Sequence, residues 1–483
     1  MNRFLVAMTG ALLLASGCAK QEPEKKECQL EAFDLSACDR SGLSSVKAEG
    51  IWHVNVSLED GSETPGAMNL TPDLGHLFGT SLTERQVEGE TFFLASDFQN
   101  PGFEPLRFAL AGCQAPTPER VRGQFRRCSG GAADLKGTFE AVHLSRQVGE
   151  PEASGVELVR EAALPDKAIA TDVFVANGYA YVTALSSGIY IFDVRDPTKP
   201  LGTPVLLSSK GDNWNQAWVK DQTLFVASSR EGILLYDVSN PAAPKRLKAL
   251  PTPAVDVWGL YVEGTRLFAM SPSPRAEVLI YDIQTPTAPS LQSRYVVEDS
   301  APESGESPVG GVVHNNQLYI AHWRYGLAVA DVTPPNQPSG QGRFGYDKAT
   351  TRWVAAGTIG ARTVVFEASE GWGSRVRALD VTNPKNIQEL GSYTPRTESS
   401  VMGLTLVGTK LYVAHSLDGL RVLDVSDPYQ LRLASWYNTW RETDPGRGRF
   451  FLDGLSSVRV SGGDSYLYAT DTSRGLLIFR EQG

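Results

Sequence analysis

The sequence predicts an all-β protein, in which a seven-bladed β-propeller follows a small disulfide-linked antiparallel β domain. Three observations support this fold class. A segment of apolar strand, Asp, short turn and Pro returns along the C-terminal part of the chain. Each copy follows a pair of short strands joined by a tight-turn sequence. No stretch of this region has the period of an amphipathic helix, so a fixed long repeat decides the architecture.

The repeat is clearest in segments 188–197, 232–241 and 419–428, each of which begins with Gly and ends with Pro. A seventh copy at 475–480 has Arg480 where the others have Asp. Upstream of the first copy, Asn177-Gly178 lies between two alternating apolar runs, which indicates a tight hairpin. With one further strand after each Pro, a unit has four antiparallel strands in about 45 residues, as a propeller blade does. Seven such units account for residues 153–483.

The last unit supplies only three strands of its own before the sequence ends. Segment 156–165 is similar to the fourth strand of an earlier unit, 246–251, which also leads into the next blade. We therefore expect residues 155–164 to complete the last blade. Closing the ring in this way covers two strand edges that would otherwise promote aggregation.

The repeated aspartates are predicted to be structural turn residues. An Asp side chain accepts hydrogen bonds from backbone N–H groups two residues on and so fixes a turn. Six equivalent carboxylates on one rim cannot converge on one substrate. The predicted turn residues, separated by 44, 45, 49, 49 and 44 positions, are Asp193, Asp237, Asp282, Asp331, Asp380 and Asp424.

The strands that end at Asp193 and Asp424 resemble the LVIVD repeats of extracytoplasmic bacterial β-propellers. The Trp-Asp and Gly-His pairs of WD40 blades are absent. The resemblance implies a protein of the cell envelope or surface. It implies no reaction and supplies no catalytic residue, so we expect no cofactor.

The N-terminus predicts export. Residues 1–17 combine Arg3, an apolar run and small residues, as a secretory signal peptide does. Cys18 directly after Ala-Ser-Gly resembles a bacterial lipobox, which implies cleavage before Cys18, lipid on its thiol and a membrane anchor. Ala15 departs from the usual Leu, and the alternative is an ordinary signal peptide with an incidental Cys. Residues 18–27 form a polar tether. Ala19 after the Cys favours the bacterial outer membrane or cell surface.

Residues 28–148 are predicted to form a small β sandwich or barrel, and the alternation of apolar and polar residues in 50–58 and 136–144 indicates strands. Segment 147–154 is predicted to be a linker.

Four cysteines, Cys28, Cys38, Cys113 and Cys128, suggest two disulfides in an exported protein. Three pairings are possible, and we favour 28–38 with 113–128. The formal net charge of −10 argues against a nucleic-acid partner.

Ligand binding is predicted on the propeller face that carries the loops between second and third strands and the connections between blades, here called the loop-rich face. Five of the nine tryptophans fall in these loops, several beside Arg. Trp, Tyr and Arg supply rigid contact area and fixed donors. The alternative is that these tryptophans cap the grooves between blades. The candidate residues are Trp214, His322, Trp323, Arg324, Tyr325, Trp353, Trp372, Trp440 and Arg441.

No metal or catalytic centre is predicted. His322, Glu367, His415 and Asp471 align at the ends of second strands, but these strands lie off the axis and neighbouring blades diverge, so the four cannot converge on one ion. The residues aligned along the axis are mostly small, and they are Asp172, Gln216, Gly259, Gly310, Ala355 and Gly403. No nucleophile elbow, P-loop or dinucleotide fingerprint occurs.

The sequence therefore predicts a lipid-anchored envelope or cell-surface protein that recognises a protein or polysaccharide through its Trp- and Arg-rich propeller face. One alternative is a hydrolase or other enzyme that uses the same face as its active site. A further alternative is a structural spacer that presents the N-terminal domain. An enzyme requires two or three ionisable groups within hydrogen-bond reach of one another.

Overall fold

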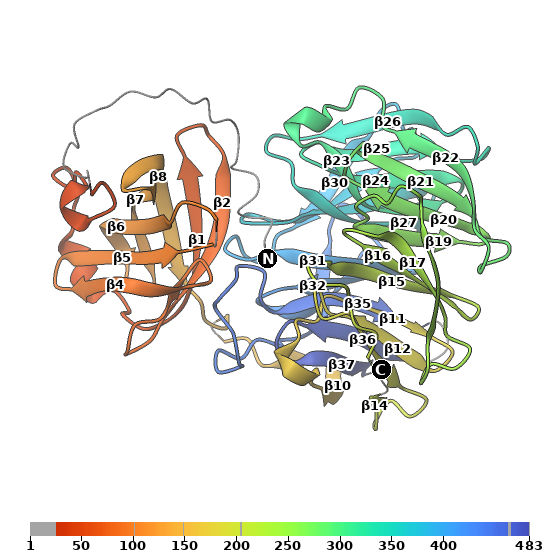
Figure 1. The fold of residues 1–483 in the computed structure, drawn as a ribbon, viewed down its shortest axis with the longest axis horizontal. Helices are drawn as coiled ribbons and strands as arrows, with labels where there is room; N and C mark the ends of the chain where they lie inside the picture. The colour runs from red at the N-terminus through yellow and green to blue at the C-terminus, as the bar shows by residue number, and fades with distance from the viewer. Residues whose placement is uncertain (1–25, 101, 148, 203–204, 462–464, 483) are drawn as a thin grey trace.

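A computed structural model gives the fold and describes residues 26–100, 102–147, 149–202, 205–461 and 465–482. The predicted signal peptide 1–17 and the predicted lipidation site Cys18 lie outside the described residues. The chain forms a closed antiparallel barrel followed by a ring of seven sheets. Figure 1 shows the barrel, coloured red to orange, against one side of the propeller. Within the described part of the chain, no helix is both long and apolar enough to cross a membrane.

The N-terminal domain is a barrel in which eight strands pair in sequence order and β8 pairs back with β1. Its interior is filled by side chains such as Trp52, Phe92 and Leu110, each at most 1% exposed. Short 3-10 helices η1 (Leu30–Ala32) and η2 (Ser41–Ser45) precede it. The strands are β1 (Gly50–Leu58), β2 (Glu63–Leu70), β3 (His76–Leu77), β4 (Thr80–Glu88), β5 (Thr91–Phe98), β6 (Leu106–Thr117), β7 (Arg120–Ser129) and β8 (Ala132–His143).

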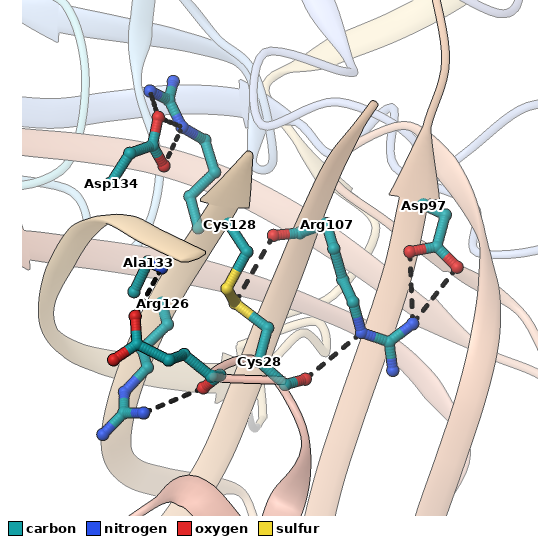
Figure 2. Close-up of a disulfide and its surroundings, with 9 residues drawn as sticks. Cys28, Asp97, Arg107, Arg126, Cys128, Ala133 and Asp134 are labelled. Atoms are coloured by element: carbon teal, nitrogen blue, oxygen red, sulfur yellow. Dashed lines mark hydrogen bonds and ion pairs between the residues drawn. A yellow bond between two sulfur atoms is a disulfide. The ribbon is translucent and has the colours of Figure 1, made fainter. Parts of the chain in front are cut away.

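Two disulfides hold the segment that precedes β1 against the barrel. They join Cys28 to Cys128 and Cys38 to Cys113, so the pairing favoured from the sequence is wrong. Figure 2 shows Cys28 and Cys128 beside Arg107, whose Nε donates to the carbonyl of Cys28 at 3.2 Å. The short-range pairing fails because the segment before β1 lies against β6 and β7, which carry Cys113 and Cys128, and sequence distance does not report that proximity.

The propeller has seven blades, numbered here in chain order, and in each the first strand is innermost. Blades 1 to 6 each take four consecutive strands, and blade 7 takes β35–β37 with β10. The inner strands are β11 (Asp172–Ala176), β15 (Trp214–Lys220), β19 (Gly259–Glu263), β23 (Ser307–His314), β27 (Thr351–Ile359), β31 (Val401–Val407) and β35 (Leu455–Val460). The second strands are β12 (Tyr179–Thr183), β16 (Thr223–Ser228), β20 (Arg266–Ser271), β24 (Gln317–Trp323), β28 (Arg362–Ser369), β32 (Lys410–His415) and β36 (Tyr466–Asp471).

The third strands carry the repeated motif, and the fourth strands form the outer edge of the ring. The third strands are β13 (Ile189–Asp193), β17 (Gly232–Asp237), β21 (Glu277–Asp282), β25 (Gly326–Asp331), β29 (Val376–Asp380), β33 (Gly419–Asp424) and β37 (Gly475–Glu481). The fourth strands are β14 (Leu201–Gly202), β18 (Lys245–Leu250), β22 (Ser290–Val296), β26 (Ser339–Gly345), β30 (Gln388–Tyr393), β34 (Arg432–Tyr437) and β10 (Val156–Ala162). Two further 3-10 helices, η3 (Pro165–Lys167) and η4 (Pro302–Ser304), lie in connections between blades.

Each repeated Asp accepts a hydrogen bond from the backbone N–H two residues on, at 2.8 to 3.1 Å. This geometry is that of a turn-fixing residue at the end of each third strand. The predicted Asn177-Gly178 turn joins β11 to β12 with φ values of 54° and 77°, which a tight hairpin requires.

The glycine that opens the motif is required by close packing within the blade. Gly232, Gly326, Gly419 and Gly475 all have positive φ. A Cβ at any of the four would overlap a backbone carbonyl oxygen of the blade's fourth strand. Only glycine allows the two strands to approach so closely at this end of the sheet.

The ring is closed by a strand from the N-terminal end of the propeller, which completes the last blade. Strand β10 pairs antiparallel with β37, from Val156 opposite Glu481 to Ala162 opposite Leu476. This confirms the prediction that residues 155–164 complete the last blade. The carbonyl that faces Gly475 is that of Ala162, so the closing strand uses the same contact as the other blades.

The segment predicted to be a linker instead packs along blade 6. Strand β9 (Ala153–Ser154) pairs with β34 as a fifth strand. The indole of Trp436 donates to the carbonyl of Pro151 at 3.1 Å, and Arg421 pairs with Glu150. The chain therefore leaves the barrel along a fixed path that ends in the closing strand.

Gly475→Ala should destabilise the ring more than a matched substitution. The new Cβ would carry the cost of positive φ and would also overlap Ala162 O, and we expect a loss of roughly 2–4 kcal/mol. Gly408→Ala is the control, because Gly408 also has positive φ but nothing lies within 4 Å of its Cβ position. Urea unfolding followed by circular dichroism measures both, and equal losses would contradict the closing contact.

Candidate functional site

The barrel docks on the loop-rich face over blades 5 to 7. Asn69 of β2 donates to the carbonyl of Arg447 at 3.2 Å, in the connection between blades 6 and 7. Arg396, before blade 6, donates to Ser145 O at 3.0 Å. An apolar cluster joins the two domains and consists of Ile51 and Leu144 of the barrel with Leu417 and Trp440 of the propeller. All four are at most 3% exposed, so the contact is a dry interface.

A histidine of the barrel is buried in this interface. His53 of β1 is fully buried, and its Nδ1 lies 2.6 Å from the carbonyl oxygen of Glu398. Its ring centroid lies 4.6 Å from that of Phe451, which in turn lies 6.3 Å from Trp372. Burial lowers the pKa of His53 to about 4, because an imidazolium would lose its water there. The ring is neutral at pH 7, and its Nδ1–H donates to the carbonyl.

Beneath the interface lies a buried charge cluster centred on Asp418. Its carboxylate is 3.2 Å from both His415 Nδ1 and Arg396 Nε, and Gln147 Nε2 donates to it at 3.3 Å. Burial alone would raise the pKa of Asp418, but the neighbouring cations outweigh burial and hold it below the ordinary range. Buried pairs of this kind favour one arrangement of their partners over others more than they add stability. Here the cluster binds Gln147, which belongs to the segment that leaves the barrel.

Several residues predicted to bind a ligand have structural positions instead. Trp214 is 1% exposed, and its indole donates to Asp212 at 2.8 Å. His322 is fully buried, and Trp440 is covered by the barrel. These three are corrected to packing residues. The tryptophan count identified a face with much apolar area, and the barrel covers part of that area.

Two other candidates lie at the edge of the docked barrel. Trp372 is partly exposed and contacts Phe451 of the interface. Arg441 is exposed, and its guanidinium lies 3.6 Å from Glu161.

The loop between β24 and β25 in blade 4 is outside the barrel contacts described above. Arg324 is exposed, has φ of 61°, and makes no hydrogen bond or ion pair with any described residue. Trp323 beside it is partly exposed. Tyr325 lies under the guanidinium of Arg343, 3.3 Å from the ring centroid. A non-glycine residue held at positive φ with a free cationic group is an unusual feature that suggests a binding contact.

The four residues considered as metal ligands are not equivalent. In blade 5, the strand register makes Ser369, not Glu367, the residue equivalent to His322, His415 and Asp471 of the other blades. A longer strand in blade 5 caused the misalignment. Glu367 pairs with Arg377 at 2.7 Å, and Asp471 with Arg447 at 2.6 Å. Among the described residues, no group of three His, Cys, Asp or Glu side chains could hold a metal ion.

The axial channel is lined by larger side chains than the sequence suggested. Its blade 5 position is occupied by Trp353, not Ala355, because both strands of the β27–β28 hairpin are longer than their counterparts in blade 6. Both residues line a cavity of about 200 Å³ on the axis, together with Trp218, Tyr261, Arg352 and Arg459. Arg352 lies 5.2 Å from the ring of Trp258 and 4.7 Å from that of Trp353, and donates to Val309 O in blade 4.

Sequence reasoning missed Trp218, Tyr261, Arg352 and Arg459 as channel residues. Two of them alternate with predicted axial positions, since Trp218 follows Gln216 by two and Tyr261 follows Gly259 by two. In blade 7, for which no axial position was predicted, Arg459 follows Ser457 by two. The period of two along each inner strand was the available signal, because alternate side chains share one face.

Three ionisable residues in or beside the loops between second and third strands, Arg324, Glu370 and His415, do not come together as a reactive group. His415 is fully buried and held by Asp418, so it cannot reach a substrate at the surface. Glu370 lies 3.9 Å from Arg352, and burial raises its pKa. Arg324, in a different blade, has no contact with either residue within the described structure.

Comparison with known families identifies LVIVD repeats in this chain, at residues 168–202, 213–248 and 400–439. These segments are parts of blades 1, 2 and 6, and they confirm the predicted repeat. A seven-bladed propeller of LVIVD repeats suggests a binding or scaffold role. No curated protein matches the sequence.

Two solved structures resemble the propeller. One is a chain in the crystal structure of a mitotic checkpoint complex, with 13% identity, a TM-score of 0.50, and coverage of 70% of this chain and 100% of that chain. The other is the computationally designed Ika8 protein, with 10% identity, a TM-score of 0.45, and coverage of 66% and 98%. At these identities the first likeness shows the fold alone, and the second carries no argument.

Trp440→Ala should release the barrel from the propeller. Removing this buried ring leaves a cavity in the interface and costs about 3–5 kcal/mol. Trypsin cleavage after the exposed Arg146 should then be faster, because its neighbours Ser145 and Gln147 are bound to Arg396 and Asp418 of the propeller in the docked state. Trp323→Ala, outside the interface, is the matched control and should be cleaved at the wild-type rate. Equal rates for all three proteins would contradict the interface.

Acid should weaken the fold through His53. Between its ordinary pKa of about 6.5 and its folded pKa of about 4, the unfolded chain binds a proton that the folded chain does not. Stability is therefore complete above this window and falls as the pH decreases through it, by up to about 2 kcal/mol between pH 7 and pH 5.

His53→Gln keeps an N–H donor for Glu398 O but does not titrate, so it should lose less stability between these pH values than the wild type. Burial raises the pKa of Asp453 to about 6, which acts in the opposite direction in both proteins. His322, with a pKa lowered to about 4 by burial, also contributes equally to both. Thermal unfolding at each pH gives the comparison, and parallel losses would exclude His53 as the source.

Proposed function

We propose that this protein is an exported, lipid-anchored binding protein of the bacterial outer membrane or cell surface. It recognises a protein or polysaccharide partner through the part of the loop-rich face around Trp323, Arg324 and Tyr325, here called the blade 4 surface. Export is supported by the signal-like sequence 1–17 and by two disulfides, which persist in oxidising compartments. The anchor rests on the lipobox-like Cys18.

The observation that carries the binding proposal is Arg324. Its guanidinium is exposed and has no partner among the described residues, although its backbone is held at φ 61° by a two-residue turn. A planar guanidinium offers fixed donors for a carboxylate, a phosphate or a backbone carbonyl. Trp323 beside it supplies partly exposed aromatic area, and this pair of residue types dominates many protein interfaces.

The docked barrel explains why recognition is proposed at blade 4. It covers the equivalent loop of blade 6 and the connection between blades 6 and 7, where Leu417 and Trp440 are already buried. Tyr325 is fixed by Arg343, and Arg343 also donates to Glu298 O and Asp299 O at 3.1 and 3.0 Å. The blade 4 surface is therefore a rigid platform, which reduces the entropy lost on binding.

Affinity capture from envelope extract tests the proposal. The bait is the chain 19–483, which contains every described residue. A partner retained by the wild type should be lost from Trp323→Ala/Arg324→Ala, because truncating such contacts costs at least about 2 kcal/mol each. Arg432→Ala, an exposed arginine beside an Asp-Pro turn on the opposite face, is the control and should retain the partner. Equal retention by all three would overturn the proposal.

A further inference from the structure

The cavity on the propeller axis has a polar lining that the proposed function does not use. It lies among the inner strands of all seven blades, from Asp172 in blade 1 to Arg459 in blade 7, and has a volume of about 200 Å³. At a share of about 30 Å³ per molecule, this is room for roughly seven waters. A space of this size can hold one small molecule.

Three residues that line the cavity each carry a buried polar atom that has no hydrogen-bond partner among the described residues. These atoms are Oδ2 of Asp172, Nε1 of Trp353 and Nε of Arg459. Asp172 is only 5% exposed, and its other oxygen accepts from Ser457 Oγ at 2.7 Å and lies 3.4 Å from Arg459 Nη2. A buried polar atom without a partner costs about 1–3 kcal/mol, so these atoms indicate a place for a polar guest.

The three atoms differ in polarity, which restricts the chemistry of that guest. Asp172 can only accept a hydrogen bond, whereas the indole and guanidinium N–H groups can only donate. A simple anion would satisfy the donors and be repelled by Asp172. A cation would satisfy Asp172 and be repelled by Arg352 and Arg459. A neutral molecule with several hydroxyl groups can satisfy all three, because each hydroxyl both donates and accepts.

The walls of the cavity are aromatic. Trp218, Tyr261 and Trp353 line it, and the ring of Trp218 lies 5.3 Å from that of Tyr261. The face of an aromatic ring carries partial negative charge, which attracts the positively polarised C–H groups of a saturated ring. A wall of this kind with a few polar groups at fixed positions is typical of sites for small ligands.

We propose that the axial channel binds a single neutral sugar ring, which stacks on these aromatic walls. Its hydroxyls donate to Asp172 and accept from Trp353 and Arg459. This site goes beyond the proposed function, because it is separate from the blade 4 surface and needs no protein partner. The sugar is either a free hexose or the terminal unit of a glycan, since both present the same ring.

Saturation-transfer NMR on the chain 19–483 tests this site. The probes are the methyl glycosides of glucose, galactose and mannose, and a trisaccharide of each. We expect saturable binding of at least one glycoside, weakened at least roughly tenfold by Trp353→Phe, which keeps a six-membered aromatic ring but removes the N–H donor and the five-membered ring of the indole. Asp172→Asn is a second variant, which keeps the shape of the side chain and removes its charge.

Arg432→Ala, on the opposite face and outside both proposed sites, should bind the glycosides as the wild type does. Envelope capture by Trp353→Phe, which leaves the blade 4 surface intact, tells failure of one proposal from failure of the other. Binding of glycoside and trisaccharide alike would identify the end of a glycan, and binding of the glycoside alone a free sugar. The sugar site would be overturned by absence of saturable binding, by unchanged affinity in folded Trp353→Phe and Asp172→Asn, or by preference for acetate or tetramethylammonium over every glycoside.

Discussion

The pairing of β10 with β37 is the contact on which the rest of the molecule depends. It converts seven sheets into a closed ring and joins residues more than three hundred positions apart, such as Val156 and Glu481. Because β10 directly follows the barrel in the sequence, ring closure also fixes where the barrel can lie. The segment before it runs along blade 6, held by Glu150, Pro151 and the short strand β9.

This arrangement divides the loop-rich face between two uses. Over blades 5 to 7 the face is an internal interface, with Trp440 and Leu417 packed against the barrel and the buried His53 among them. At blade 4, Arg324 remains exposed without a partner in the described structure. Aromatic residues and arginines of this face therefore stabilise the domain interface at one place and are exposed for recognition at another. Whether the barrel covers them distinguishes the two cases.

The candidate site was only partly predictable from the sequence. Trp323, Arg324 and Tyr325 were selected because they fall in a loop of the correct face, and they are at the surface. Trp214 and His322 were selected by the same rule and are buried, because they belong to strands β15 and β24 and not to the loops beside them. Glu367 and Ala355 were each placed two residues from the equivalent position, because β27 and β28 are both longer than their counterparts. Sequence spacing does not record such shifts, and each shift changes which side chains face the channel.

By itself, the sequence determined the repeat, the number of blades, the turn role of the aspartates and the strand that closes the ring. These features depend on local periodicity and on residues with special backbone preferences, such as the glycines of the motif. Both can be recognised directly in the sequence. The tertiary structure alone decided the disulfide pairing, the docking of the barrel and the lining of the channel. Each of these depends on which distant residues meet, and that is set by packing between domains and by the register of individual strands.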